Sequence, residues 1–167
     1  GSINTNTGIV GVNQDAGNMN NQANMVSLSI VTAGTDDTLP GFANSQASAS
    51  QYNDDNQVVT FEATATGPQK TDYILDSISK NTGIVGVNQS VGNMNNQANQ
   101  VVIAVDENAW VALAEADLGQ FNAGNTVIEF GTVKTDTISG SINGNSGIVS
   151  VNQSAGNMNN QSNMVSI

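Results

Sequence analysis

Pairs of neighbouring carboxylates are the residues of this chain that are best suited to catalysis or to ion binding. They occur at 36–37, 54–55 and 106–107. Two carboxylates can catalyse glycoside hydrolysis or bind Ca²⁺. Adjacent acids in loops rich in Gly, Asn and Thr are more often solvated turn residues. We therefore predict no cofactor, and we keep Asp54 and Asp55 only as a weak candidate calcium site.

Nucleophilic and redox catalysis lack the residues that they require. The chain has no Cys and no His, which excludes thiol chemistry, the usual zinc sites and any His base. A methionine column, Met19, Met94 and Met158, could suggest haem or copper, but without His or Cys we interpret it as core packing. We predict that the protein is not an enzyme. A β-helix polysaccharide lyase is a third hypothesis, which the absence of Arg and His disfavours.

The charge balance limits the partners. Net charge is −11, and Lys70, Lys80 and Lys134 are the only cations. Nucleic acid binding depends on cations that neutralise phosphate, so nucleic acid is excluded as a partner. Anionic membrane surfaces are disfavoured for the same reason, and no apolar run approaches the ~20 residues of a membrane span, so we predict no membrane insertion.

A polar motif of 17 residues occurs three times, at 8–24, 83–99 and 147–163, and 13 of its positions carry the same residue type in every copy. Most of the shared residues are Asn, Gln and Gly. With its flanks, each copy forms a unit of 27 residues, which we call strip 1 (2–28), strip 2 (77–103) and strip 3 (141–167). Two insertions, 29–76 and 104–140, separate the strips. We predict a single domain over 1–167.

Each strip is predicted to form a strand, a turn and a second strand. Ile9, Val10 and Val12 are β-branched and favour a pleated chain. Gly17-Asn18 and its counterparts supply a turn that tolerates left-handed φ values. No apolar stripe of period 3.6 supports a helix here.

The insertions are predicted to be small α/β elements. Helices are expected at 43–51 and, with Asp106 as N-cap and Gly119 as stop, at 106–118. Strands are expected at 57–66 and 125–133. Residues 70–74 align with 134–138, so the two insertions are related. Trp110 is expected in an apolar core of the insertions.

Identical polar strips are explained by a parallel, in-register stack with ~4.8 Å between rungs. An amide has a donor and an acceptor, so a column of equal Asn or Gln side chains can form a hydrogen-bonded ladder. The expected fold is mainly β: a three-rung β-solenoid-like stack of strand-turn-strand repeats with two small α/β insertions. The alternative is that the repeats only reflect duplication of a sequence segment and form exposed Asn-rich loops. The predicted self-assembly ladders are Asn13, Asn88 and Asn152; Gln14, Gln89 and Gln153; and Gln22, Gln97 and Gln161.

Neither outer strip is an atypical cap, so we expect open ends that act as templates for another chain. The open end after strip 3 is expected at Val165 and Ile167. Stacking strip 3 on strip 1 of another copy does not close, so it builds a filament. The expected partner is the protein itself, as a homopolymer.

The motif resembles the repeats of bacterial functional amyloid subunits. The spacing Val12-x-Gln14-x-x-Gly17-Asn18-x-x-x-Gln22 is similar to curlin repeats. The string from Gly11 to Asn24 is closer still to the repeats of Fap-type amyloid subunits. This resemblance implies secretion across the outer membrane, an extracellular, cell-surface fibre and a place in biofilm matrix or adhesion. It covers the three strips, about half of the chain.

Two functions from different classes therefore stay open. The leading hypothesis is a secreted structural subunit that assembles head to tail into extracellular filaments. The alternative is a monomeric β-solenoid adhesin that binds glycan through its insertions, where Trp110 and Tyr73 could stack on sugar. Donor-strand exchange is a second possible mode of contact between subunits.

Overall fold

Every regular element that the structure describes is a β-strand. The structure is a computed structural model, and it describes residues 3–32, 41–61, 67–107 and 109–167. No helix occurs in these ranges, and none is therefore long and apolar enough to cross a membrane. The strands are β1 (Thr7–Asp15), β2 (Asn21–Val31), β3 (Gly41–Asp54), β4 (Gln57–Phe61), β5 (Gln69–Leu75), β6 (Thr82–Ser90), β7 (Asn96–Asp106), β8 (Ala109–Ala123), β9 (Thr126–Phe130), β10 (Val133–Ser139), β11 (Ser146–Ser154) and β12 (Asn160–Ser166).

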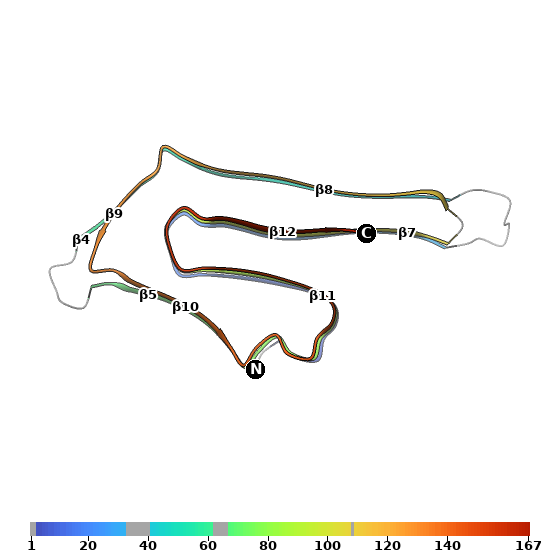
Figure 1. The fold of residues 1–167 in the computed structure, drawn as a ribbon, viewed down its shortest axis with the longest axis horizontal. Coiled ribbons are helices and arrows are strands. Elements are labelled where there is room, and N and C mark those ends of the chain that lie inside the picture. Colours follow the sequence, from blue (N-terminus) through green and yellow to red (C-terminus); the bar gives the residue numbers. More distant parts are fainter. Residues whose placement is uncertain (1–2, 33–40, 62–66, 108) are drawn as a thin grey trace. The chain divides into compact units, whose positions relative to one another are not determined.

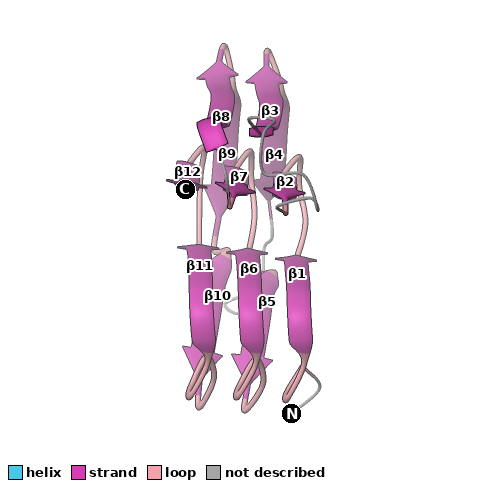
Figure 2. Ribbon diagram, turned by 90° about the vertical axis from the view of Figure 1, so that its right-hand side faces the viewer, coloured by secondary structure: helices cyan, strands magenta, loops and turns pink. Residues whose placement is uncertain are grey.

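The two strands of each strip lie in different sheets, because each pairs with its equivalents in the other strips. One sheet has the order β1-β6-β11, is parallel and is in register: Ile84 of β6 pairs with Ile9 and with Ile148. The other sheet has the order β12-β7-β2. Its backbone bonds include Ala104 N to Ile167 O at 2.8 Å and Ile167 N to Val102 O at 3.0 Å, the pattern of a parallel pairing. Figure 2 shows β1, β6 and β11 side by side in this order.

The two insertions also pair with each other, strand by strand. β3 pairs with β8, β4 with β9 and β5 with β10. The last pair matches Lys70 with Lys134 and Ile74 with Ile138, which confirms the predicted alignment of 70–74 with 134–138. Viewed as in Figure 1, β10 runs along β5 and β9 along β4. The chain thus repeats one path, with strip 2 between the other two strips.

The predicted helices are wrong. Residues 43–51 lie inside β3, and the predicted helix at 106–118 falls on the end of β7 and on β8. Trp110 is 83% exposed, so it is not a core residue either. The strands predicted at 57–66 and 125–133 are present as β4 and β9, and residues 62–66 lie outside the described ranges.

The chain divides into two compact units. The first comprises Gly1–Asn24, Gln51–Asn99 and Gln120–Asn163. Within it, one face of the β1-β6-β11 sheet packs on β5 and β10 through an apolar core of Ile74, Ile78, Val85 and Val87. Its other face lies toward the β12-β7-β2 sheet (Figure 1). Amide side chains bridge the two sheets, as Asn24 Nδ2 does by donating to Val12 O. Alternation along each strand therefore separates an apolar interior from a polar one.

The second unit comprises Met25–Ser50, Gln100–Gly119 and Met164–Ile167. Here the later parts of β2, β7 and β12 face β3 and β8. Small side chains lie between them: Ala43 and Ser45 are buried, and Ser45 Oγ donates to Ser27 Oγ at 2.8 Å. Gln100 Nε2 donates to Asp117 O at 2.8 Å.

In strips 1 and 2 the turn between the two strands has the predicted left-handed φ values, whereas in strip 3 the positive φ lies at Met158. Gly17 has φ 128°, and the following Asn18 and its counterpart Asn93 have φ 64° and 68°. The side chain of Asn20 closes the turn, because its Nδ2 donates to Gly17 O at 2.7 Å. Asn is tolerated at positive φ better than most residues, which explains the repeated Gly-Asn.

A substitution at Gly83 tests the close stacking of the strips. Gly83 has φ 123°, and a Cβ there would come much closer to Gly8 O in strip 1 than van der Waals contact allows. We expect Gly83→Ala to lower the free energy of unfolding by about 3 kcal/mol, from backbone strain and overpacking together. Denaturant unfolding followed by circular dichroism measures it. The control is Gly156→Ala, where nothing lies within 4 Å. Equal losses in both variants would contradict the stacking.

Candidate functional site

Two of the three predicted amide columns are joined by side-chain hydrogen bonds. In the first, Asn88 Nδ2 donates to Asn13 Oδ1 and Asn152 Nδ2 donates to Asn88 Oδ1, each at 3.0 Å. In the second, Gln22 Nε2 donates to Gln97 Oε1 at 2.9 Å. Gln97 Nε2 in turn donates to Gln161 Oε1 at 2.8 Å.

The same amides also bind backbone across the two sheets. The Nε2 groups of Gln22, Gln97 and Gln161 each donate, at 2.7 Å, to a carbonyl on the first strand of their own strip. Each side chain therefore holds its strip to the next strip and its two strands to each other. Asn88 and Gln97 are fully buried, and buried amides are stable only when they are hydrogen-bonded.

The column of Gln14, Gln89 and Gln153 is in register but is bonded differently. Gln14 Nε2 donates to Tyr73 O at 3.2 Å, and Gln89 Nε2 donates to Thr137 O at 3.4 Å. These side chains lie on the face of the sheet that packs on β5 and β10. The neighbouring insertion thus supplies their acceptors.

Further columns were not singled out from the sequence. Asn99 Nδ2 donates to Asn24 Oδ1 at 2.9 Å, and Asn163 Nδ2 donates to Asn99 Oδ1 at 3.0 Å. A similar chain joins Asn21, Asn96 and Asn160 at 3.0 and 3.1 Å. The signal was present, because each of these positions is Asn in every strip.

A charged cluster fastens the insertions to the turns of the strips. Glu129 lies between two paired lysines: its Oε1 is 2.9 Å from Lys70 Nζ and its Oε2 is 2.5 Å from Lys134 Nζ. Burial opposes ionisation, but the hydrogen bonds from Lys134 and Lys70 outweigh it and lower the pKa of Glu129. The lysines also donate to the turn residues Asn18, Asn93 and Asn157.

The calcium hypothesis gains no support from the geometry. Asp54 ends β3, and Asp55 follows it with φ 49° and its backbone N bonded to Ala123 O at 3.0 Å. Within the described residues, no group of three or more His, Cys, Asp or Glu side chains could hold a metal ion. A calcium site at Asp54 and Asp55 stays a prediction.

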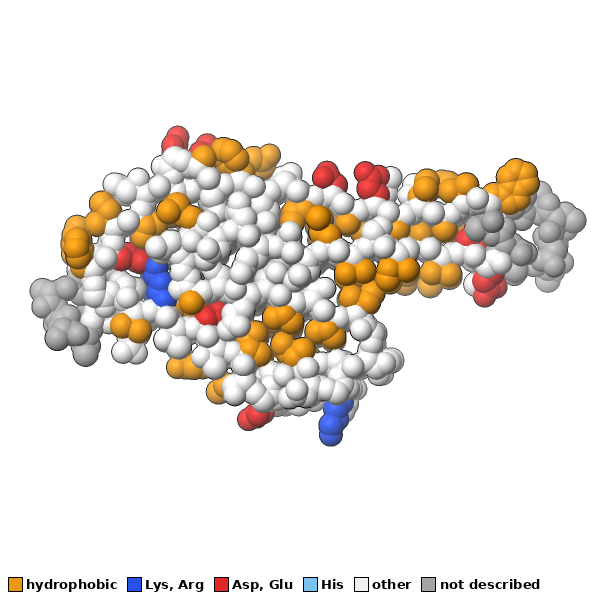
Figure 3. Space-filling view, in the orientation of Figure 1, with side chains coloured by type: hydrophobic (Ala, Val, Ile, Leu, Met, Phe, Trp, Pro, Cys, Tyr) orange, Lys and Arg blue, Asp and Glu red, His pale blue; other side chains and the backbone are white. Residues whose placement is uncertain are grey.

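The outer strips are more exposed than strip 2. Every residue from Val85 to Val102 is buried, whereas the equivalent Asn13 in strip 1 and Gln153 in strip 3 are exposed. At the far end of β12, Val165 is half-buried and Ile167 is 61% exposed. Most of the face in Figure 3 carries neither charge nor large apolar side chains, in keeping with its Asn, Gln, Ser and Gly content.

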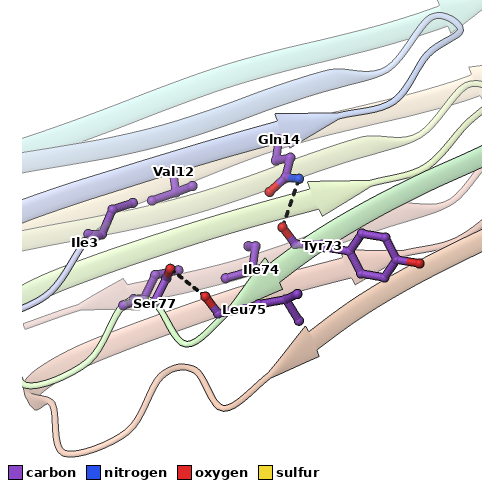
Figure 4. Close-up of a pocket in the computed structure, with 8 residues that line it drawn as sticks. Ile3, Val12, Gln14, Tyr73, Ile74, Leu75 and Ser77 are labelled. Carbon is purple, nitrogen blue, oxygen red and sulfur yellow. Dashed lines mark hydrogen bonds between the residues drawn. The ribbon is translucent and has the colours of Figure 1, made fainter. Parts of the chain in front are cut away.

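The apolar core is open on the side of strip 1. A cavity of about 270 Å³ is lined there by Ile3, Val12, Ile74 and Ile78, with Gln14, Tyr73, Leu75 and Ser77 around them (Figure 4). The equivalents of its lining residues, Ile142 and Val151, pack on the same core from strip 3. The cavity therefore lies beside strip 1 at the edge of the two-stranded β10-β5 sheet, which has one strand fewer than the β1-β6-β11 sheet that it covers.

Parallel in-register sheets joined by columns of identical amides are the architecture of an amyloid-type subunit. The comparison with protein families agrees: residues 1–167 match the Functional amyloid protein FapB/FapC family, and the chain belongs to this family of structural amyloid subunits. It is 34% identical over 116 residues to the functional amyloid subunit FapC of Pseudomonas aeruginosa, an alignment that covers 68% of the chain and 33% of that relative. The match thus spans about a third of the relative's length. No solved structure matches the chain significantly.

Replacing one buried amide by a carboxylate tests whether the columns stabilise the fold. Asn88→Asp removes a donor that serves Asn13 Oδ1 and Ala23 O and places a carboxylate beside these acceptors. We expect a loss of about 3 kcal/mol or more in the free energy of unfolding, measured in denaturant. Asn44→Asp on the exposed face of β3 makes the same chemical change and should cost less than about 0.5 kcal/mol. A tolerated Asn88→Asp would disprove the importance of this column.

Proposed function

We propose that the protein is a secreted structural subunit that polymerises into an extracellular amyloid fibre, with strip 3 of one copy stacked on strip 1 of the next. The observation that carries the proposal is the complete burial of residues 85–102 in strip 2, which has a near-identical strip on each side. An added copy would give strips 1 and 3 the environment that strip 2 already has.

The polarity of the amide columns favours head-to-tail addition. In the Gln22 column the donors point from strip 1 toward strip 3, and in the Asn13 column they point the other way. A copy added in the same direction would continue both columns, with Gln161 donating to the next Gln22. Membership of an amyloid family and the FapC relative support polymerisation. Secretion, the extracellular location and a role in biofilm matrix or adhesion follow from the resemblance to such subunits, and the role is structural rather than enzymatic.

A second candidate function, glycan adhesion, is favoured by exposed aromatic rings on the insertions. The rings of Phe61 and Phe130 stack with centroids 5.4 Å apart, and both side chains are more than half exposed. Negative-stain microscopy separates the two functions. Uniform unbranched fibres support polymerisation, and persistent monomers at high concentration support a monomeric adhesin.

Fibre diffraction tests the mode of stacking. Three strips per subunit at ~4.8 Å predict an axial ~4.8 Å repeat and a subunit rise of about 14 Å. A rise several times larger would indicate another contact, such as donor-strand exchange. The layer spacing comes from X-ray fibre patterns and the rise from helical image analysis.

A glycine pair tests the contact between copies. Gly83 and Gly147 each lie against the carbonyl of the equivalent glycine one strip below, so Gly8 should lie against Gly147 O of the next copy. In the single subunit nothing lies within 4 Å of a Cβ at Gly8 (φ 120°) or at Gly17 (φ 128°). Both alanine variants thus have similar backbone strain, but only Gly8→Ala should obstruct stacking.

We expect Gly8→Ala to leave about tenfold more soluble subunit at equilibrium than Gly17→Ala, because a clash of ~1.4 kcal/mol corresponds to a factor of ten. Sedimentation followed by protein assay measures it. Equal solubility of the two variants would argue against strip 3 stacking on strip 1.

A further inference from the structure

Two aspartates are stacked on each other inside the first unit. Asp72 of β5 and Asp136 of β10 are paired in register, so their carboxylates lie one above the other on the same side of the sheet. Both face the ends of the strip strands: Asp136 Oδ2 accepts from Ser154 N at 3.1 Å, and Asp72 accepts from Ser90 N. Asp72 is only 4% exposed.

Each carboxylate accepts from a backbone N–H and from a glutamine side chain, Gln14 for Asp72 and Gln153 for Asp136, and still leaves one oxygen without a donor. Asp72 Oδ2 and Asp136 Oδ1 are buried and have no hydrogen-bond partner among the described residues. A third buried oxygen, Gln89 Oε1, is also unpaired, and its side chain lies beside Asp136 because Gln89 Nε2 donates to Thr137 O. An unmet buried acceptor costs about 1–3 kcal/mol, so a proton held between the two aspartates would stabilise this part of the stack.

The surrounding charges do not neutralise the pair. From β1, Asp15 adds a further negative charge near Asp72. β6 and β11 carry no titratable side chain. On the aspartates' own strands, Lys70 and Lys134 are engaged by Glu129 and by the turn asparagines. A buried and a half-buried carboxylate that are stacked on each other cannot both be ionised without a cost in free energy.

Burial raises the pKa of Asp136 to about 6, and the charge of Asp72 adds to the increase. Burial, followed by the charge of Asp15, also raises the pKa of Asp72. A carboxyl pKa that is higher in the folded state means that folding takes up a proton. The stabilisation is therefore complete below the ordinary value of 3.8 and is lost as the pH rises through about 6.

We propose that Asp72 and Asp136 share a proton between their unpaired oxygens, and that this makes pairing of the two insertions, and hence polymerisation, favoured in mildly acidic surroundings. This inference rests on the proposed function, because its test measures soluble subunit in equilibrium with fibres. The proton is held between Asp72 Oδ2 and Asp136 Oδ1 as a carboxylic acid–carboxylate hydrogen bond. Assembly on a surface that acidifies would thus be strengthened by the fold itself.

The test measures soluble subunit in equilibrium with fibres at about pH 7.5 and about pH 5. For the unsubstituted chain we expect about a tenfold drop at the lower pH, within the roughly 100-fold limit set by a pKa of about 6 for Asp136 in the folded state against an ordinary value of 3.8. Asp136→Asn supplies a permanent donor, so its solubility should be low at both pH values. Asp117→Asn, an equal loss of charge at an exposed position of β8, should keep the drop.

Infrared spectra of the fibres give a second readout that does not depend on solubility. The carbonyl band of a protonated carboxylic acid should be present at about pH 5, fade through about pH 6 and be weaker in Asp136→Asn. Retention of the full solubility drop in Asp136→Asn, or absence of the band, would overturn the proposal. Calcium that lowers solubility at neutral pH only when Asp136 is present would also overturn it, since a cation would then satisfy the three oxygens. Failure to form fibres at either pH would instead count against the proposed function.

Discussion

In-register parallel stacking requires every side chain to be compatible with a copy of itself about 5 Å away. Asn and Gln meet this requirement because each amide donates at one end and accepts at the other. Asn88 and Gln97 show the result: both are fully buried, yet each is bonded to its equivalents in both neighbouring strips. The polar identity of the strips follows from this constraint, and so does a core that is amide-rich on one side of the β1-β6-β11 sheet.

Charged residues are unfavourable in such a stack, because each would lie next to a copy of its own charge. Equal charges at this spacing repel by roughly 3 kcal/mol at an effective dielectric constant of about 20. The strips almost avoid them, with only Asp15 and Lys80. The insertions stack charges twice and resolve them differently. Lys70 and Lys134 share the counter-ion Glu129, whereas no ion pair within the described residues joins a lysine to Asp72 or Asp136. Under the proposed sharing of a proton by Asp72 and Asp136, the stability of this part of the stack depends on pH.

The repeats in the sequence predicted the strands, turns and amide columns of the strips. The local helix signals in the insertions gave wrong predictions, because strand pairing between the insertions outweighs them. Equal residues at equal positions indicated the strands, the turn at Gly17-Asn18 and the Asn13 and Gln22 columns. The region of β8 carries an N-cap, apolar residues and a terminal Gly, which are ordinary helix signals. Its in-register pairing with β3 outweighs them, and side chains from Leu113 to Leu118 alternate between exposed and half-buried positions. No local pattern reveals such a partner from 69 residues away.

The direction of each side chain was the second source of error. Val12, Asn13 and Gln14 are consecutive, so Asn13 faces β2 while Val12 and Gln14 face β5. A Gln on the β5 side finds backbone carbonyls such as Tyr73 O within reach and has less need of its own equivalents. Strand parity thus decides which neighbour a repeated amide faces. The Asn24 column faces β1 across the same interior as Asn13. The Asn21 column faces β3 and β8 instead, and it forms as well.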